Sequence, residues 1–266
     1  MILEKTVTSI DELTQVLNSL PNHYVFRGQC NAKWGLQSAL ERLLGRTWAA
    51  EKATKFEAYS LTTFQSKYHI YCGQEHTPKS KLAWLSVMQH YGVPTRLIDF
   101  TTSPYIALYF ALEKYDPLLK QDFSIFLIDY SSLMENSLAF IKKNDRTFLE
   151  TRTSMQNKQD EVFELTIDRR AYDIAWLTEP TELNARIDRQ SGTFLMTGNL
   201  GQRIEDVLNS ATYRTTTIQK IVIPAKLYES VYVGLRKMSI NAKSIYGDLA
   251  GLASSIQMEL RNYASE

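Results

Sequence analysis

One stretch of the sequence decides the fold: residues Gln89–Ala111 read QHYGVPTRLIDFTTSPYIALYFA. Gly92 suits the position just beyond a helix C-terminus, because a residue without a Cβ atom adopts a positive φ angle at little cost. Pro94 then prevents the helix from resuming. The apolar residues over 97–100 are typical of a short buried strand. The stretch therefore predicts a helix that ends near Tyr91, followed directly by a strand.

A second helix is predicted immediately after this strand. Ser103 is a good N-cap, and Pro104 suits the first helical position. The expected helix, Tyr105–Lys114, is apolar on nearly every side, which indicates that it is buried. Polar residues surround the short strand at both ends: His90, Tyr91, Thr95, Arg96, Asp99, Thr101, Thr102 and Ser103. So many polar groups on a buried scaffold predict a functional site.

Capping residues and hydrophobic periodicity predict further elements on both sides of this stretch. The predicted helices are Ser9–Leu20, Ser38–Leu44, Thr47–Tyr68, Lys81–Tyr91, Leu227–Lys237 and a last helix within Lys243–Leu260. The predicted strands are His23–Arg27, which Gly28 is expected to end, Ser124–Tyr130, Gly192–Thr197 and Ile218–Ile223. Ser131–Arg170 is polar and weakly periodic, so we expect a partly helical lid or peripheral insertion there.

Helices that precede and separate a few non-adjacent strands favour a mixed α+β domain. We expect one domain over residues 1–266. Its N-terminal part, to about residue 90, is expected to be mainly helical. A β-rich core should follow to about residue 225, and a C-terminal helical part should complete the chain.

Composition places the chain among ordinary globular proteins. Its 266 residues are 44% hydrophobic and 22% charged, enough to bury a full core. Thirty basic and twenty-nine acidic residues leave a net charge of +1, which gives no overall argument for nucleic acid or an anionic membrane. Cys30 and Cys72 are too few for a disulfide framework, so a cytoplasmic protein is expected. The sequence shows no signal peptide and no apolar run that would span a membrane.

Three blocks of sequence resemble the FRG domain family, which takes its name from a Phe-Arg-Gly signature. The first block is Phe26-Arg27-Gly28-Gln29. The second consists of His90, Gly92, Val93, Pro94, Thr95, Arg96, Leu97, Asp99, Thr102, Ser103 and Pro104. The third consists of Asn184, Arg186, Ile187, Gln190, Gly192 and Phe194. The C-terminal part is similar too, although the family usually has Phe-Pro where Tyr246-Gly247 stands.

The layout of this family in turn resembles the ADP-ribosyltransferase fold of the Arg–Ser–Glu type, a mixed split β-sheet flanked by helices. In those enzymes a first-strand arginine, a Ser/Thr strand and a late glutamate surround bound NAD. The resemblance implies that the corresponding positions are Arg27, Thr101–Ser103 and the neighbourhood of Gln190. It therefore implies NAD as the substrate.

Arg27, with Gly28 and Gln29 beside it, could form a bidentate contact to a phosphate or a ribose. The alternative is a structural arginine that bonds loop carbonyl groups. Thr101 and Thr102 offer hydroxyl groups for the nicotinamide ribose, whereas Ser103 is expected to cap the helix in any case. The role of Arg96 has two interpretations as well. Arg96 is a candidate second phosphate contact, and the alternative is an internal pair between Arg96 and Asp99.

His90 and Asp99 are candidates for acid–base catalysis, and the alternative for His90 is that it secures the helix end. Gln190 stands where a glutamate is expected. Its amide can bond a ribose hydroxyl, but it cannot accept a proton. Three explanations remain open: no base is needed there, the fold binds a nucleotide without cleaving it, or another carboxylate serves. The candidate carboxylates are Asp99, Asp188, Glu179 and Glu182.

Three functions follow from these observations. The first is an NAD-dependent ADP-ribosyltransferase or NAD hydrolase, acting as an effector, toxin or phage-defence component. Its acceptor would be protein, nucleic acid or water, and a neutralising or sensor protein could bind it. The second is a nucleotide- or RNA-binding sensor without turnover, and the third is a protein-interaction domain. Motifs for a phosphate loop, a dinucleotide fingerprint, a zinc protease and an α/β-hydrolase are absent, and we expect no metal site.

Overall fold

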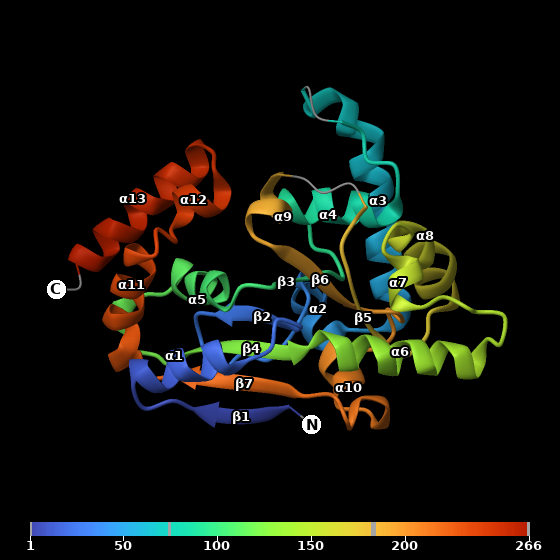
Figure 1. Cartoon of the computed structure of the whole chain (residues 1–266). Coiled ribbons are helices and arrows are strands. Elements are labelled where there is room, and N and C mark those ends of the chain that lie inside the picture. The colour runs from blue at the N-terminus through green and yellow to red at the C-terminus, as the bar shows by residue number, and fades with distance from the viewer. Residues whose placement is uncertain (1, 74–75, 182–184, 265–266) are drawn as a thin grey trace.

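A mixed seven-stranded sheet forms the centre of the computed structural model, which describes residues 2–73, 76–181 and 185–264 (Figure 1). The strands are β1 (Leu3–Thr6), β2 (Tyr24–Gln29), β3 (Ile98–Thr101), β4 (Phe123–Asp129), β5 (Ala175–Thr178), β6 (Gly192–Thr197) and β7 (Ile218–Ile223). Their order is β1-β7-β4-β2-β3-β6-β5. β1 and β7 run parallel, and the other neighbours are antiparallel.

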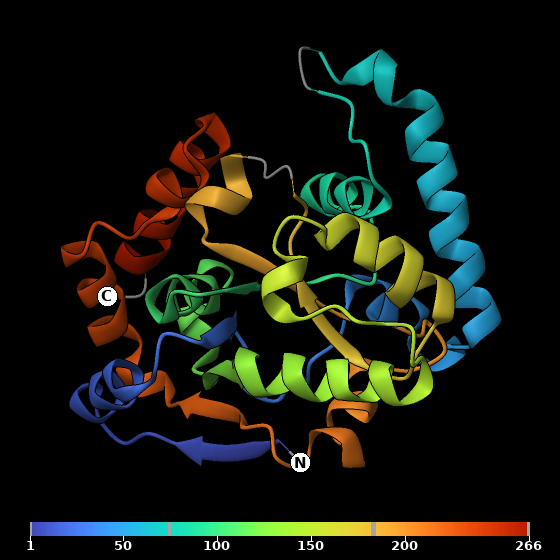
Figure 2. The same cartoon turned by 45° about the vertical axis from the view of Figure 1, so that its right-hand side comes forward.

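Helices cover both faces of this sheet (Figure 1). They are α1 (Ile10–Ser19), α2 (Ala39–Leu44), α3 (Ala50–Tyr71), α4 (Lys81–His90), α5 (Pro104–Glu113), α6 (Tyr130–Asn144), α7 (Arg152–Met155), α8 (Gln159–Val162), α9 (Ala185–Arg189), α10 (Ile204–Leu208), α11 (Tyr228–Lys237), α12 (Ala242–Tyr246) and α13 (Leu249–Tyr263). Figure 2 shows α3 along one side of the molecule, beyond the sheet. The predicted α+β class, with a mixed sheet flanked by helices, is confirmed.

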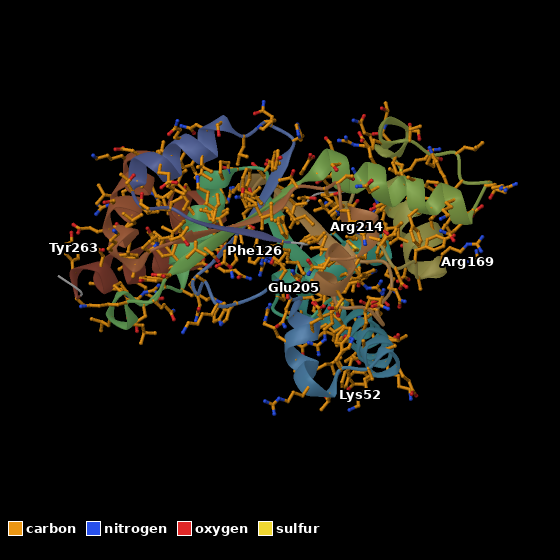
Figure 3. All side chains as sticks on the ribbon, turned by 90° about the horizontal axis from the view of Figure 1, so that it is seen from below. Lys52, Phe126, Arg169, Glu205, Arg214 and Tyr263 are labelled. Atoms are coloured by element: carbon orange, nitrogen blue, oxygen red, sulfur yellow. The ribbon has the colours of Figure 1, made fainter. Side chains whose placement is uncertain are left out.

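Two hydrophobic cores lie on opposite faces of the sheet, because successive side chains of a strand point to opposite sides. In β4, Ile125 and Leu127 join the core under α1, α5 and α11. Phe126 and Ile128 join the core under α4, α6 and α10. Phe126 lies near the middle of the molecule (Figure 3). β4 is buried on both faces, as the apolar run Ile125–Ile128 indicates.

The sheet is nearly divided between β2 and β3. β2 pairs with β4 along its whole length, and β3 pairs with β6 along its whole length. β2 and β3, however, share a single registered pair, Phe26 with Thr101. Because the two strands separate beyond this pair, side chains from both can line one cavity. This division positions the candidate site.

The structure confirms the predictions for the central stretch. α4 ends at His90, and Gly92 adopts φ +80°. β3 follows at Ile98–Thr101. The hydroxyl of Ser103 accepts a hydrogen bond of 3.3 Å from the backbone N–H of Ile106, and Pro104 is the first residue of α5. Local capping chemistry therefore sets the helix–strand–helix order.

Gly28 does not end β2, contrary to the prediction. The strand continues to Gln29, and Gly28 pairs with Ile125 of β4. A Cβ atom at Gly28 would meet the carbonyl oxygen of Ala107 and the backbone nitrogen of Ala111. The glycine is therefore required because α5 lies directly on β2, rather than because a turn is needed.

Gly28→Ala is expected to destabilise the fold by about 1–3 kcal/mol, because backbone atoms of α5 cannot move aside as a flexible side chain can. Urea denaturation measures this change. Gly234→Ala is the matched control, since a Cβ atom there meets nothing within 4 Å. In a helix that substitution should stabilise the protein by about 0.5–1 kcal/mol. Equal midpoints for the two variants would contradict the close packing of α5 on β2.

Residues 131–170 are not a lid or a peripheral insertion. α6 occupies most of the first part, and Leu133 and Ile141 are fully buried on the sheet. Phe163, in a π-helical turn after α8, is fully buried as well. Buried apolar side chains of this kind make the segment part of the core. The prediction also missed β1, so the first ninety residues supply two strands of the sheet.

Candidate functional site

A cavity of about 850 Å³ opens where β2 and β3 separate, and we call it the split cavity. Its wall consists of Phe26–Gln29 from β2, Asp99–Thr101 from β3, the end of α5 with Phe110, Glu113 and Lys114, and Cys30, Lys33, Trp34, Gly35, Gln37, Arg42, Gln190 and Tyr246. Six of the ten predicted site residues are among them: Arg27, Gly28, Gln29, Asp99, Thr101 and Gln190. The first and second sequence blocks therefore meet at this cavity.

Arg27 crosses the gap between the two strands. Its Nη1 donates a hydrogen bond of 2.7 Å to the backbone carbonyl of Asp99. Its Nε is buried and has no hydrogen-bond partner among the described residues. Burial lowers the pKa of the guanidinium, and nearby Asp99 partly opposes this change. An anion beside Arg27 would favour the charged form and could satisfy the unpartnered Nε.

Two amide side chains in the same wall are also incompletely satisfied. Gln29 donates from Nε2 to the carbonyl of Gly35 at 2.9 Å, but its buried Oε1 has no partner in the described chain. The buried Nε2 of Gln190 has none either. Buried polar atoms are usually paired, so each such atom requires an explanation. Three of them in the wall of one cavity indicate a place where polar ligand atoms can bind.

A smaller cavity of about 50 Å³ adjoins the split cavity and shares Asp99 and Gln190 with it. His90 lines this smaller cavity. The carboxylate of Asp99 is exposed and accepts a hydrogen bond of 3.1 Å from Gln89 Nε2. Gln89 Oε1 in turn accepts one of 2.5 Å from the hydroxyl of Thr95. Gln89 therefore orients Asp99, and the predicted catalytic residues lie together at one edge of β3.

Thr101 is a positioning residue. Its buried hydroxyl donates to the carbonyl of Gln190 at 2.7 Å and accepts from the N–H of Ser103 at 3.1 Å. The hydroxyl is thus engaged in holding Gln190 beside β3, which does not fit the predicted ribose contact. Thr102 and Ser103 lie outside the wall of the split cavity. Ser103 caps α5, as one interpretation of the sequence held.

Arg96 lies in a different place and does not pair with Asp99. Its guanidinium binds both carboxylate oxygens of Glu57, and Nη2 lies 2.8 Å from Asp168 Oδ1. Burial by itself would lower the pKa of Arg96, but these two carboxylates outweigh it and raise that pKa. Lys81 completes the network, because its Nζ lies 2.7 Å from Asp168 Oδ2 and 3.2 Å from Glu57 Oε1. Arg96 therefore ties α3 and α4 to the core, and we remove it from the site.

The third sequence block lies beside the smaller cavity. Ile187 packs against Gly192, where a Cβ atom would come within 3.3 Å of it, and Phe194 is buried. Asn184 and the side chain of Arg186 are outside the described residues. So is Glu182, one of the alternative carboxylates. Another alternative, Glu179, lies in a separate cavity of about 520 Å³, where burial raises its pKa.

Several residues of the split cavity were missed by the sequence analysis. Its wall holds four basic side chains, because Lys33, Arg42 and Lys114 line it together with Arg27. The carboxylates of the described wall are those of Asp99 and Glu113. Trp34 adds a large ring that is 53% exposed. The signal for Lys33 and Trp34 was available, because both follow the Phe-Arg-Gly block by a few residues.

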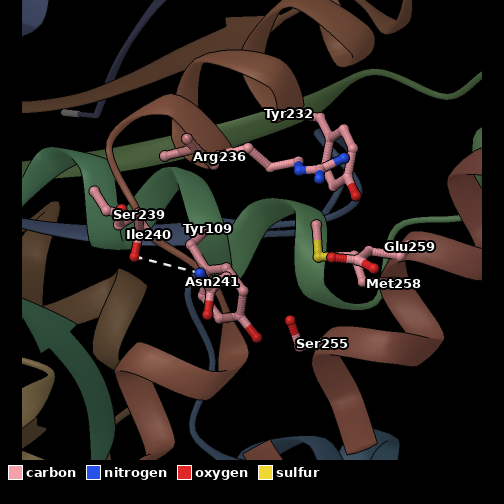
Figure 4. A pocket seen from close by; sticks show the side chains of 10 residues that line it. Tyr109, Tyr232, Arg236, Ser239, Ile240, Asn241, Ser255, Met258 and Glu259 are labelled. Atoms are coloured by element: carbon pink, nitrogen blue, oxygen red, sulfur yellow. Dashed lines mark hydrogen bonds between the residues drawn. The ribbon is translucent and has the colours of Figure 1, made fainter. Parts of the chain in front are cut away.

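Glu113 was hidden in an otherwise apolar helix. Its Oε1 accepts a hydrogen bond of 3.1 Å from Tyr109 and another from the hydroxyl of Tyr246. Burial, and then Glu113 itself, raise the pKa of Tyr109, so its hydroxyl stays a donor. Tyr109 also borders a fourth cavity, of about 220 Å³, which none of the predicted site residues lines (Figure 4). Arg236 and Asn241 in that cavity contact their own neighbours, Tyr232 and Ser239.

Residues 22–118 match the FRG domain family, which supports the predicted resemblance over that part of the chain. The match contains the first and second sequence blocks and ends before the third. No curated protein and no solved structure matches the chain, so the resemblance to ADP-ribosyltransferases remains a prediction. Among the described residues, no group of three His, Cys, Asp or Glu side chains could hold a metal ion. None of the helices described is both long and apolar enough to cross a membrane.

Proposed function

We propose that the split cavity binds NAD and that the protein cleaves the bond between nicotinamide and ribose, as an ADP-ribosyltransferase or an NAD hydrolase. The observation that carries the proposal is the Nε of Arg27, which is buried and unpartnered in the wall of a basic cavity. A dinucleotide carries two phosphates and requires a cavity near the upper end of the usual 300–1,000 Å³. The volume and the four basic side chains fit both requirements.

The residues of the wall divide among the parts of such a ligand. Arg27 would bind the pyrophosphate with paired, charge-assisted hydrogen bonds, and Lys33 and Arg42 would add positive charge. The half-exposed ring of Trp34 offers a surface on which a base can stack. Gln190, fixed by Thr101, would bond a ribose hydroxyl through its unpartnered Nε2. Each of these contacts uses a group that already faces or borders the cavity.

The cleavage requires a proton acceptor rather than a metal. Nicotinamide leaves with the electron pair of the broken C–N bond and becomes neutral, while the ribose carbon becomes electron-deficient. A hydroxyl group of the acceptor or of water then bonds to that carbon and loses its proton. The exposed carboxylate of Asp99, beside Gln190 and His90, is suited to take it. Asp99 thereby supplies the base that the amide of Gln190 cannot provide.

Consumption of NAD or modification of a macromolecule harms a cell, which suits an effector, a toxin or a phage-defence component. A protein partner that neutralises or triggers the enzyme belongs to the same proposal. The second candidate function is a nucleotide or RNA sensor without turnover. Gln190 favours it, because an amide cannot accept a proton. Glu113 favours it too, since two tyrosine hydroxyls already engage one of its oxygens.

Arg27→Ala tests the binding step. Loss of a charge-assisted contact to phosphate should weaken NAD binding roughly 10- to 100-fold, measured by titration calorimetry. The free energy of unfolding should fall by only about 1 kcal/mol, because the variant loses one bond to a carbonyl group. Arg214→Ala is the control, since Arg214 is basic, exposed and outside the cavity (Figure 3). Unchanged NAD affinity in Arg27→Ala would contradict the proposal.

A further inference from the structure

α13 carries a stripe of large apolar side chains on its outer face. The stripe consists of Leu249, Leu252, Ile256, Leu260 and Tyr263, each between 42% and 83% exposed. At 3.6 residues per turn these five positions fall within about 80° of one another around the helix. Isolated exposed apolar residues are common on soluble proteins, but a continuous stripe marks a contact surface.

The opposite face of α13 is the one that attaches the helix to the protein. Gly251 and Met258 are buried there. A Cβ atom at Gly251 would meet the backbone carbonyl of Ala242 and the Cβ of Tyr246, so α13 lies directly on α12. The stripe therefore faces away from α12, and its last residue, Tyr263, lies at the outer edge of the molecule (Figure 3).

No charged side chain interrupts the stripe within the described part of α13. The charged residues of the helix, Glu259 and Arg261, are partly buried beside it. Arg261 also donates hydrogen bonds to the carbonyl groups of Glu113 and Tyr115. An uncharged stripe can face a copy of itself without like-charge repulsion. The stripe of one copy is therefore complementary to the stripe of a second copy, which favours self-association.

The area of the stripe fits a small dimer interface. At about 200 Å² for each fully exposed large side chain, the stripe exposes on the order of 600 Å². Two stripes facing each other would remove about 1,200 Å² from water, which is the lower limit for specific protein–protein interfaces. We propose that α13 forms a two-fold homodimer interface in which the stripes of two copies pack antiparallel around Ile256. The proposal does not depend on the function of the split cavity.

The antiparallel direction follows from electrostatics. Antiparallel helices place the positive end of one helix dipole beside the negative end of the other. The same arrangement brings Asp248, at the N-terminus of one α13, toward the end that carries Arg261 in the second copy. A parallel pair would instead place the two Asp248 carboxylates together, which is unfavourable.

Sedimentation over a range of protein concentrations tests the dimer. The mass should rise from 30.6 kDa toward twice that value as the concentration passes through the micromolar range. Ile256→Glu should remain monomeric throughout, whereas Leu149→Glu, at a more exposed site outside the stripe, should dimerise as the parent protein does. Both substitutions are at exposed positions, so both should leave the melting temperature unchanged. A parent protein that stays monomeric, or an Ile256→Glu variant that still dimerises, would overturn the proposal.

Disulfide crosslinking tests the direction. In an antiparallel pair the two copies of residue 256 meet, so Ile256→Cys should form an intermolecular disulfide under mild oxidation. Leu249→Cys should not, because its copy would lie at the far end of the interface. The parent protein controls for Cys30 and Cys72. Efficient crosslinking through Leu249→Cys would overturn the antiparallel arrangement.

Discussion

Asp99→Asn is expected to lower the rate of nicotinamide release at least 100-fold while leaving the affinity for NAD nearly unchanged. A general base contributes about 10²- to 10⁴-fold to the rate, and asparagine cannot accept the proton. Binding should persist because Arg27 bonds the backbone carbonyl of Asp99 and Thr101 holds Gln190, so neither of these contacts uses the Asp99 carboxylate. The fold should persist as well, since an asparagine oxygen can still accept the hydrogen bond from Gln89.

Single-turnover measurements with saturating NAD separate this effect from a loss of binding. Asp188→Asn is the matched control, because Asp188 is an exposed carboxylate on the nearby α9 that lines neither cavity. It should release nicotinamide at the parental rate. An Asp99→Asn variant with parental activity would contradict the role of Asp99 and leave Glu113 as the carboxylate of the split cavity.

Arg96→Ala is expected to produce the largest loss of stability, about 3–5 kcal/mol in the free energy of unfolding. The substitution leaves Glu57 and Asp168 without their main partner, and Glu57 is almost completely buried. Guanidinium denaturation measures the change. Replacing Arg96 and Glu57 together by apolar residues of similar volume should cost less, because no unpaired buried charge remains.

Lys55→Ala is the control for this prediction. Lys55 and Glu51 form an ion pair of 2.7 Å on the exposed face of α3. Exposed pairs contribute little, so the loss should be below about 1 kcal/mol. If Arg96→Ala lowered stability no more than Lys55→Ala, the buried network would not hold α3 and α4 as the structure indicates. A stable Arg96→Ala protein with weakened NAD binding would return Arg96 to the site.

The parts of the fold that depend on neighbouring residues were predictable from the sequence. The cap at Ser103 and the helix end at Gly92 were identified because a serine directly before a proline and a glycine two residues before one act on the local backbone. α6 was expected only as an undefined part of a partly helical lid or insertion, although the signal for a buried helix was present. Leu133, Ser137 and Ile141 recur at the spacing of a helix face and are all buried. Polar residues between them concealed that pattern.

The parts that depend on distant residues were not predictable in the same way. Arg96 was a candidate phosphate contact because it lies among the polar residues around the short strand, whereas its partners Glu57 and Asp168 are far along the chain. Gly28 was read as a strand end because the approach of α5 is a tertiary contact. Conversely, the family resemblance assigned Arg27, Asp99 and Gln190 to one site, and all three line the split cavity although they come from three separate segments of the chain.

Incubation of the purified wild-type protein with NAD, with and without cell lysate, tests the central claim most directly. Mass spectrometry would follow free nicotinamide and the ADP-ribose that leaves with water or becomes attached to an acceptor. We predict that nicotinamide is released in equal amount to the ADP-ribose product, in at least one of the two conditions. Absence of release in both, together with no binding of NAD in calorimetry, would contradict the account.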